Sequence, residues 1–229
     1  MTSRSPTGRY APSPTGTLHL GNLRTALLAW LFARSQGARF LLRIDDLDRS
    51  RVRPRIAEQQ LADLAALGLD WDGPVVRQSQ RLELYAAAIE QLEGAGLLYR
   101  CYCTRAEIRE AASAPHGAPA EGIYPGTCRE LSAARRAEHE RSGRPAALRL
   151  RAQGTVVEFC DRLLGTRRDV VDDLVVRRND GAPAYNLAVV IDDAAQDVRE
   201  VVRGADLLDT TARQLHLGAL LGLPAAAHA

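Results

Sequence analysis

The chain has 229 residues, of which 46% are hydrophobic, and this composition excludes an intrinsically disordered protein. We expect a soluble, cytoplasmic protein without a membrane partner, because no apolar run approaches the roughly 20 residues of a membrane span and no leader peptide is visible. The formal net charge of +2 excludes little, but all 30 basic residues are arginine and none is lysine.

The first 34 residues predict a strand, a loop and a helix. Gly8–Ala11 is a short strand, prolines and a glycine interrupt it, and apolar residues recur at helical spacing from about Leu20 onward. The N-terminus of such a helix suits a phosphate group. His19 and Asn22 would place side-chain donors beside it, and Gly21 leaves room for a flat base or for close backbone packing.

Strands and helices continue to alternate up to residue 100. A strand is expected at Arg39–Ile44, a helix begins at Pro54 and ends before Gly68, and Ser79 caps the next helix. The alternation predicts an α/β fold with a parallel, Rossmann-like sheet, whose ligands bind at the carboxyl ends of the strands.

Acidic residues follow the second predicted strand directly: Asp45, Asp46 and Asp48. A carboxylate at a strand's carboxyl end can hold an amino group of a ligand. For Asp46 and Asp48 we favour the alternative of a solvated turn.

From Leu98 onward the pattern indicates a mixed, mainly antiparallel insertion. A capping box at Thr104 and Glu107 begins a short helix, and a further helix is expected at Ser132–Arg141. Short alternating segments lie at Ala147–Leu150, Thr155–Phe159 and Leu174–Arg178. The run Asn179–Gly181 is a hairpin turn that leads into Pro183–Ile191. Paired arginines in this region can meet RNA phosphates or form a plain solvated face: Arg135–Arg136, Arg167–Arg168 and Arg177–Arg178.

Cysteines indicate a metal site in the same region. Cys101, Cys103 and Cys128 could bind zinc, which takes four ligands, because cytoplasmic proteins seldom keep disulfides. On chemistry alone the fourth ligand is His116 rather than Tyr124, and unpaired structural thiols are the alternative. Cys160 lies in an apolar run and is expected to be a core thiol.

The run Arg9–Gly16, followed by His19-Leu20-Gly21-Asn22, resembles the class I aminoacyl-tRNA synthetases of the glutamyl group. The second four residues stand where that family has a His-Ile-Gly-His signature. The resemblance implies a Rossmann-like catalytic domain split into residues 1–100 and 185–229. Residues 101–184 would form an inserted α+β subdomain that carries zinc and resembles the part of the family that receives the tRNA acceptor end.

The resemblance also implies ligands and site residues. ATP with Mg²⁺ would bind at His19, Gly21 and Asn22, with His19 and Asn22 catalytic. L-glutamate would contact a set of residues that supplies two guanidinium groups, a phenol and a carboxylate: Arg9, Tyr10, Ala11, Pro12, Ser13, Asp45, Tyr185 and Arg203. The family usually has Glu at the position of Asp45. Structural alternatives are a core tyrosine at 185 and an arginine on a sheet edge at 203.

Within this family, the Cys-x-Cys and Tyr-x-x-x-Cys spacing matches the zinc ligands of the glutamyl-Q tRNA(Asp) synthetases, which favours Tyr124 over His116. These enzymes activate glutamate with ATP and transfer it to the queuosine base in the anticodon of tRNA(Asp), and we expect a monomer. The alternatives are an N-terminal fragment of an ordinary glutamyl-tRNA synthetase that charges tRNA(Glu), or a synthetase-like binding protein without catalysis.

The family carries a second signature loop that contains lysine, and a chain without lysine cannot include it. Because residues 220–225 resemble the segment that leads into this loop, we expect the chain to be truncated before it. In the family the lysine of that loop contacts the ATP phosphates, so we expect this 229-residue form to lack that contact.

Overall fold

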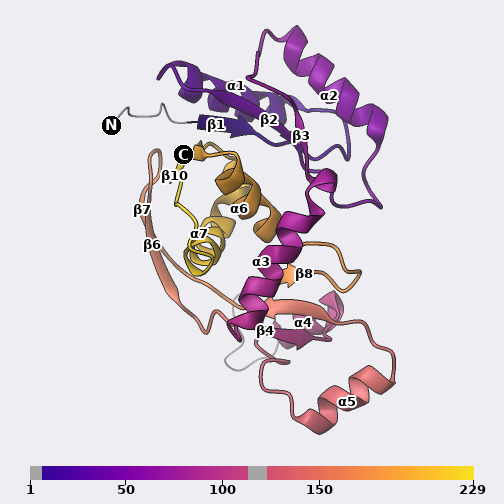
Figure 1. Ribbon diagram of the computed structural model, residues 1–229. Coiled ribbons are helices and arrows are strands. Elements are labelled where there is room, and N and C mark those ends of the chain that lie inside the picture. Colours follow the sequence, from indigo (N-terminus) through magenta and orange to yellow (C-terminus); the bar gives the residue numbers. More distant parts are fainter. Residues whose placement is uncertain (1–6, 113–122) are drawn as a thin grey trace.

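A computed structural model describes residues 7–112 and 123–229 (Figure 1). Its main element is a seven-stranded sheet in which neighbouring strands are parallel, except for an antiparallel pair at one edge. The strand order is β3 (Val76–Arg77), β2 (Phe40–Ile44), β1 (Thr7–Tyr10), β9 (Val198–Val201), β10 (Ala227–His228), β6 (Val156–Asp161) and β7 (Gly165–Val170). The predicted Rossmann-like α/β fold is therefore confirmed.

Helices connect and cover these strands: α1 (Leu20–Arg34), α2 (Pro54–Ala66), α3 (Leu82–Gly94), α6 (Tyr185–Ala195) and α7 (Thr211–Leu220). Figure 1 shows α6 and α7 side by side below the sheet, with the β6–β7 hairpin curving along α7. Among the described residues, no helix is long and apolar enough to cross a membrane.

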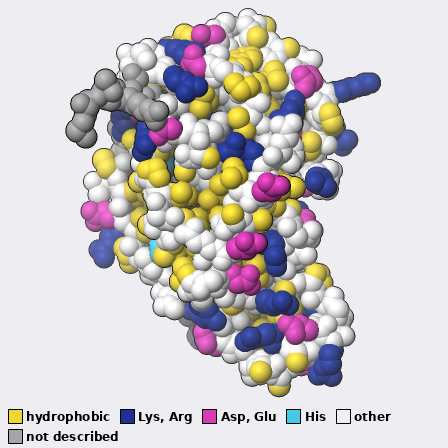
Figure 2. All heavy atoms as spheres, in the orientation of Figure 1, with side chains coloured by type: hydrophobic (Ala, Val, Ile, Leu, Met, Phe, Trp, Pro, Cys, Tyr) yellow, Lys and Arg dark blue, Asp and Glu magenta, His cyan; other side chains and the backbone are white. Residues whose placement is uncertain are grey.

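A second, antiparallel sheet lies at the far end of the molecule and contains β4 (Leu98–Cys101), β5 (Ala147–Leu150) and β8 (Val175–Arg177). Helices α4 (Arg105–Ala112) and α5 (Ala133–Arg141) accompany it, and α3 runs from the main sheet towards it (Figure 1). The predicted capping box is present, because Thr104 and Glu107 exchange hydrogen bonds of 2.6 and 3.2 Å. The lobe around α5 displays both basic and acidic side chains (Figure 2).

The order of the main sheet reverses between β1 and β9. From β1 the chain builds outward through β2 and β3, whereas β9 and β10 extend the sheet in the other direction. In parallel sheets, ligands bind beyond the carboxyl ends of the strands at such a reversal. The segments that follow Tyr10 and Val201 are therefore the expected walls of a binding site.

Several local predictions are wrong. Ser79 does not cap α3, because its N–H and hydroxyl both donate to Asp46 at 2.7 Å, and Asp46 is buried rather than solvated. Cys160 is exposed, because alternation along β6 places it on the outer face of the strand. The turn before Pro183 leads to one isolated bridge and then to α6, where a second strand was expected.

A cluster of buried charges joins the sheet to α6. Arg43 on β2 is fully buried, and its Nη1 lies 2.6 Å from Asp193 Oδ1. Its Nε lies 2.8 Å from Asp45 Oδ1 and 3.7 Å from Asp192 Oδ2. Arg81 approaches Asp192 from the other side, with 2.6 Å between Nε and Oδ1. We call these residues, together with Arg9, the Arg43 cluster.

We expect Arg43→Leu to lower the free energy of unfolding by about 3–5 kcal/mol, because buried carboxylates would lose their counter-charge. Urea denaturation measures the change. Arg55→Leu, at an exposed position on α2, is the control and should shift stability by less than about 0.5 kcal/mol. Equal losses in the two variants would contradict a special role for Arg43.

Candidate functional site

A cavity of about 930 Å³ opens where the sheet reverses, a size typical of small-molecule sites. Its walls come from the loop after β1, the beginning of α1, the end of β2, the beginning of α6 and the segment after β9. All the nucleotide and glutamate residues predicted from the sequence line this one cavity: Arg9, Tyr10, Ala11, Pro12, Ser13, His19, Gly21, Asn22, Asp45, Tyr185 and Arg203.

His19 and Asn22 form a capping box at the beginning of α1, which the sequence analysis did not identify. His19 Nδ1 accepts from the backbone N–H of Gly21 and Asn22 at 3.1 and 3.4 Å, while Asn22 Oδ1 accepts from His19 N–H at 3.2 Å. A neutral imidazole that accepts at Nδ1 carries its proton on Nε2. The cap therefore leaves His19 Nε2–H and the Asn22 amide group as the donors that these two side chains can offer a ligand.

Gly21 is required by the position of the neighbouring His19 ring. A Cβ at this position would lie 2.9 Å from His19 Cε1 and 3.1 Å from Nδ1. Real Cβ atoms do not approach a ring this closely, so the ring or the backbone would have to move. The glycine thus allows the imidazole to fold back over the first turn of α1.

Arg203 follows β9, a strand inside the sheet, so it is not an edge residue. Its side chain is 7% exposed, and Nη1 lies 2.9 Å from Asp161 Oδ2. Its Nε donates to Thr211 Oγ1, also at 2.9 Å. Nη2 is buried and has no hydrogen-bond partner among the described residues. A buried donor without a partner costs about 1–3 kcal/mol, so this atom is suited to an anionic ligand in the cavity.

Arg9 forms an ion pair within the protein. It is therefore not a free positive charge for the substrate, as the count of two guanidinium groups from the sequence had assumed. Its Nε and Nη2 donate to the two carboxylate oxygens of Asp193 at 3.3 and 3.2 Å, and Nη1 donates to the carbonyl of Val202. Asp193 and Asp161 were missed by sequence reasoning. Two adjacent aspartates at the end of an apolar run, Asp192 and Asp193, were the available signal.

Asp45 and Tyr185 are the other polar side chains of this part of the cavity. Burial raises the pKa of Asp45 to about 6 against the opposing effect of Arg43, so the carboxylate is mainly ionised at neutral pH. Tyr185 is the first residue of α6 and is 44% exposed at the cavity wall. It is therefore not the core tyrosine that was the structural alternative.

The predicted metal ligands converge in the small sheet region. Sγ atoms of Cys101, Cys103 and Cys128 all lie within 4.8 Å of one another, with 3.4 Å between Cys103 and Cys128. Tyr124 Oη lies 3.4 Å from Cys101 Sγ and 3.7 Å from Cys103 Sγ. Tetrahedral zinc with Zn–S bonds near 2.3 Å separates its sulfur ligands by roughly 3.8 Å. These four side chains therefore fit the ion, whereas His116 lies outside the described residues.

Hydrogen bonding prepares this cluster for a cation. The contact with Cys128 lowers the pKa of Cys101 to about 4, and the same contact raises the pKa of Cys128. Burial raises the pKa of Tyr124, whose hydroxyl oxygen accepts from Cys128 N–H at 2.8 Å. The guanidinium of Arg149 lies 3.7 Å from the centroid of the Tyr124 ring. A divalent ion would displace the protons that the cysteine thiols carry.

Comparison with known proteins agrees with this geometry. Residues 7–229 match the family model described as tRNA synthetases class I (E and Q), catalytic domain. A glutamyl-Q tRNA(Asp) synthetase from Nocardia farcinica is 67% identical over 222 residues, covering 97% of the chain and 70% of that relative. Another, from Cutibacterium acnes, is 56% identical over 230 residues, covering 98% of the chain and 64% of the relative.

A similar solved structure is that of a glutamate tRNA ligase from Elizabethkingia meningosepticum in complex with its amino acid. It superposes with a TM-score of 0.84 at 31% identity. The match covers 98% of the chain and 49% of the ligase, so the chain spans about half of its length.

We expect Gly21→Ala to displace the His19 ring, because the new Cβ would lie 2.9 Å from Cε1. Imidazole ¹⁵N NMR should show the Nε2–H tautomer in the wild type and a mixture of tautomers in the variant. Gly16→Ala is the matched control, since a Cβ there meets nothing within 4 Å. A wild-type His19 signal in Gly21→Ala would mean that the ring does not depend on the glycine.

Proposed function

The chain belongs to the class I tRNA synthetases of the glutamate and glutamine group, and we propose that it activates L-glutamate with ATP and transfers it to the queuosine base of tRNA(Asp). The names of relatives at 67% and 56% identity support this choice within the family. We expect a monomer as the working unit.

The observation that supports glutamate most directly is the buried, unpartnered Nη2 of Arg203, a residue that lines the cavity. An arginine with one free donor suits a carboxylate, which accepts charge-assisted hydrogen bonds. Asp45 lines the same cavity and is the acidic partner for the substrate ammonium, while Arg9 and the Tyr185 hydroxyl complete the polar lining. Arg203 Nη2 for a carboxylate and Asp45 for an ammonium group match the two charged ends of an amino acid.

In the activation step, a glutamate carboxylate oxygen attacks the α-phosphorus of ATP in line, and pyrophosphate leaves. The protein contributes positioning and charge stabilisation. His19 Nε2–H and the Asn22 amide group are donors for the phosphate oxygens, because the backbone N–H groups of Gly21 and Asn22 already donate to His19 Nδ1. Mg²⁺ enters with ATP and neutralises the pyrophosphate.

In the transfer step, a hydroxyl of the queuosine cyclopentenediol attacks the glutamyl carbonyl of the mixed anhydride, and AMP leaves. Residues 1–100 and 185–229 would form the catalytic halves, with the RNA-facing insertion at 101–184. The β6–β7 hairpin falls within the insertion range but extends the main sheet. Strands β5 and β8, in contrast, belong to the second sheet.

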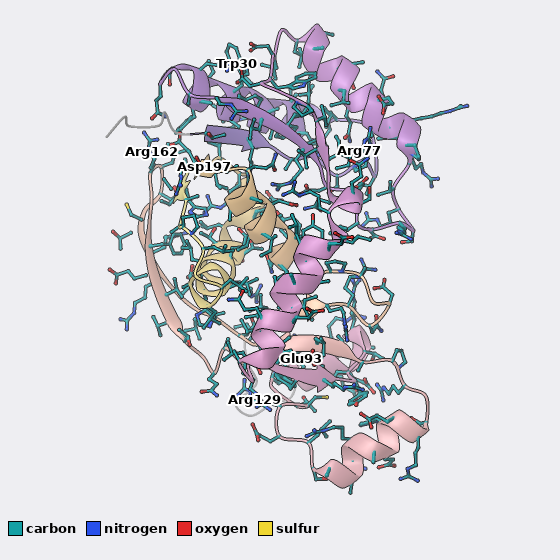
Figure 3. The ribbon with its side chains drawn as sticks, in the orientation of Figure 1. Trp30, Arg77, Glu93, Arg129, Arg162 and Asp197 are labelled. Atoms are coloured by element: carbon teal, nitrogen blue, oxygen red, sulfur yellow. The ribbon has the colours of Figure 1, made fainter. Side chains whose placement is uncertain are left out.

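Zinc is the metal that fits Cys101, Cys103, Tyr124 and Cys128. When bound, it supplies a structural cross-link between the end of β4 and the loop before α5, rather than an activated water. Four protein ligands close the coordination shell. Arg129, labelled in Figure 3, lies next to this loop and anchors it through a 2.6 Å hydrogen bond to Asp173.

We expect the wild-type protein to catalyse glutamate-dependent exchange between ATP and pyrophosphate without tRNA. Arg203→Ala should raise the glutamate KM by about 10- to 100-fold, the scale of a lost charged hydrogen bond in a buried site, with the KM for ATP unchanged. Arg135→Ala on the exposed face of α5 is the control. Absence of exchange in the wild type would refute glutamate activation, and a wild-type KM in Arg203→Ala would remove Arg203 from the site.

Elemental analysis should find one zinc per chain. Cys128→Ser should lose most of this zinc because a ligand is removed, whereas Cys160→Ser, which changes an exposed thiol outside the cluster, should retain it. Tyr124→Phe should bind zinc more weakly than the wild type in a competition with a chelator. No zinc in the wild type, or equal zinc in Cys128→Ser and the wild type, would contradict the site.

A further inference from the structure

Asp161 is a buried carboxylate that uses both of its oxygens. It is the last residue of β6 and is 1% exposed. Oδ1 accepts hydrogen bonds from the backbone N–H of Leu163 and of Leu164, both at 2.9 Å, and Oδ2 accepts from Arg203 Nη1 at 2.9 Å. Although burial acts to raise it, the pKa of Asp161 is lowered by hydrogen bonds from Arg203 and the turn amides. The group is therefore ionised at neutral pH.

The turn that Asp161 holds is part of the cavity wall. Leu163 and Leu164 both line the cavity, although their exposed fractions are 64% and 52%. Because both side chains are more than half exposed, packing holds them only in part, and the hydrogen bonds to Asp161 hold the backbone of their turn. One carboxylate thus fixes both an apolar wall and the arginine beside it.

On the basis of the glutamate activation proposed above, we propose that Asp161 is a positioning residue for glutamate recognition. Asp161 binds Nη1 of Arg203, and Thr211 binds Nε. Nη2 is the guanidinium nitrogen that has no partner among the described residues, so it is the one left to bind the substrate carboxylate. The same carboxylate also binds the turn amides. Binding of a substrate carboxylate to Arg203 therefore also stabilises the turn at Leu163 and Leu164. Asp161 itself does not contact the reacting atoms.

Asp161→Asn tests this role, because an amide oxygen can still accept from the turn but no longer provides a charge for Arg203. In the pyrophosphate exchange assay we expect the glutamate KM to rise about 10-fold or more, as for the loss of a charged hydrogen bond. The KM for ATP and kcat at saturating glutamate should change less than about twofold. A general loss of folding would not produce this split between substrates.

Glu158→Gln is the matched control, because it makes the same carboxyl-to-amide change on the exposed face of the same strand and should behave as the wild type. In an Arg203→Ala background, Asp161→Asn should add little to the KM, since its effect acts through Arg203. Full additivity of the two changes, or a wild-type glutamate KM in Asp161→Asn, would overturn the role of Asp161.

Hydrogen exchange in the wild-type protein provides a readout that does not depend on the stability of a variant. Saturating glutamate should slow exchange of the Leu163 and Leu164 amides and leave those of α5 unchanged. If glutamate leaves the hydrogen-exchange rates of the Leu163 and Leu164 amides unchanged in a protein that catalyses pyrophosphate exchange, the link from Asp161 to the turn is contradicted. No pyrophosphate exchange in the wild type would instead refute the proposed function, so the two failures are distinguishable.

Discussion

The guanidinium of Arg43, fully buried between β2 and α6, is the interaction on which the rest of the site depends. It binds Asp193 near the end of α6, and Asp193 in turn holds Arg9 at the end of β1. Its Nε fixes Asp45 at the cavity wall. Removing any one charge from this cluster would leave others buried without partners, which is costly. The cluster therefore sets the position of two predicted glutamate contacts at once.

The same interaction also places a contact at the opposite end of α6. The helix begins with Tyr185 at the cavity and reaches Asp192 and Asp193 near its end. Because a helix is rigid over this length, fixing its carboxyl-terminal end against Arg43 and Arg81 also fixes the direction in which Tyr185 leaves it. Arg43, Arg81, Asp192 and Asp193 lie outside the sequence motifs, and they thus organise residues that the motifs contain.

Aspartates recur as connectors between separate parts of the molecule. Asp172 accepts from Tyr124 N–H at 3.0 Å and from Arg213 Nε at 2.6 Å, which ties the cysteine cluster to α7. Helix α7 begins with Thr211, the partner of Arg203 Nε. The cysteine cluster and the cavity are therefore both connected by hydrogen bonds to the beginning of α7.

Local sequence signals predicted the elements whose boundaries are marked by residues within the same segment. An example is the strand, loop and helix before Arg34, where proline and glycine mark the boundaries. The errors have tertiary causes. Asp46 reads as a turn residue, but the later segment at Ser79 buries it. β-branched residues before Asp192 favour a strand, yet packing on α7 and the Arg43 cluster select helix α6. Sequence motifs named the cavity residues, whereas Arg43, Asp161 and Asp193 act through long-range contacts that no local pattern contains.

The most direct test of the account is the transfer of radiolabelled glutamate by the purified protein to tRNA(Asp) with and without queuosine, in the presence of ATP and Mg²⁺. We expect label on the anticodon fragment of queuosine-containing tRNA(Asp), and none on unmodified tRNA(Asp) or on tRNA(Glu). Label at the acceptor end of tRNA(Glu), with none on queuosine-containing tRNA(Asp), would contradict it.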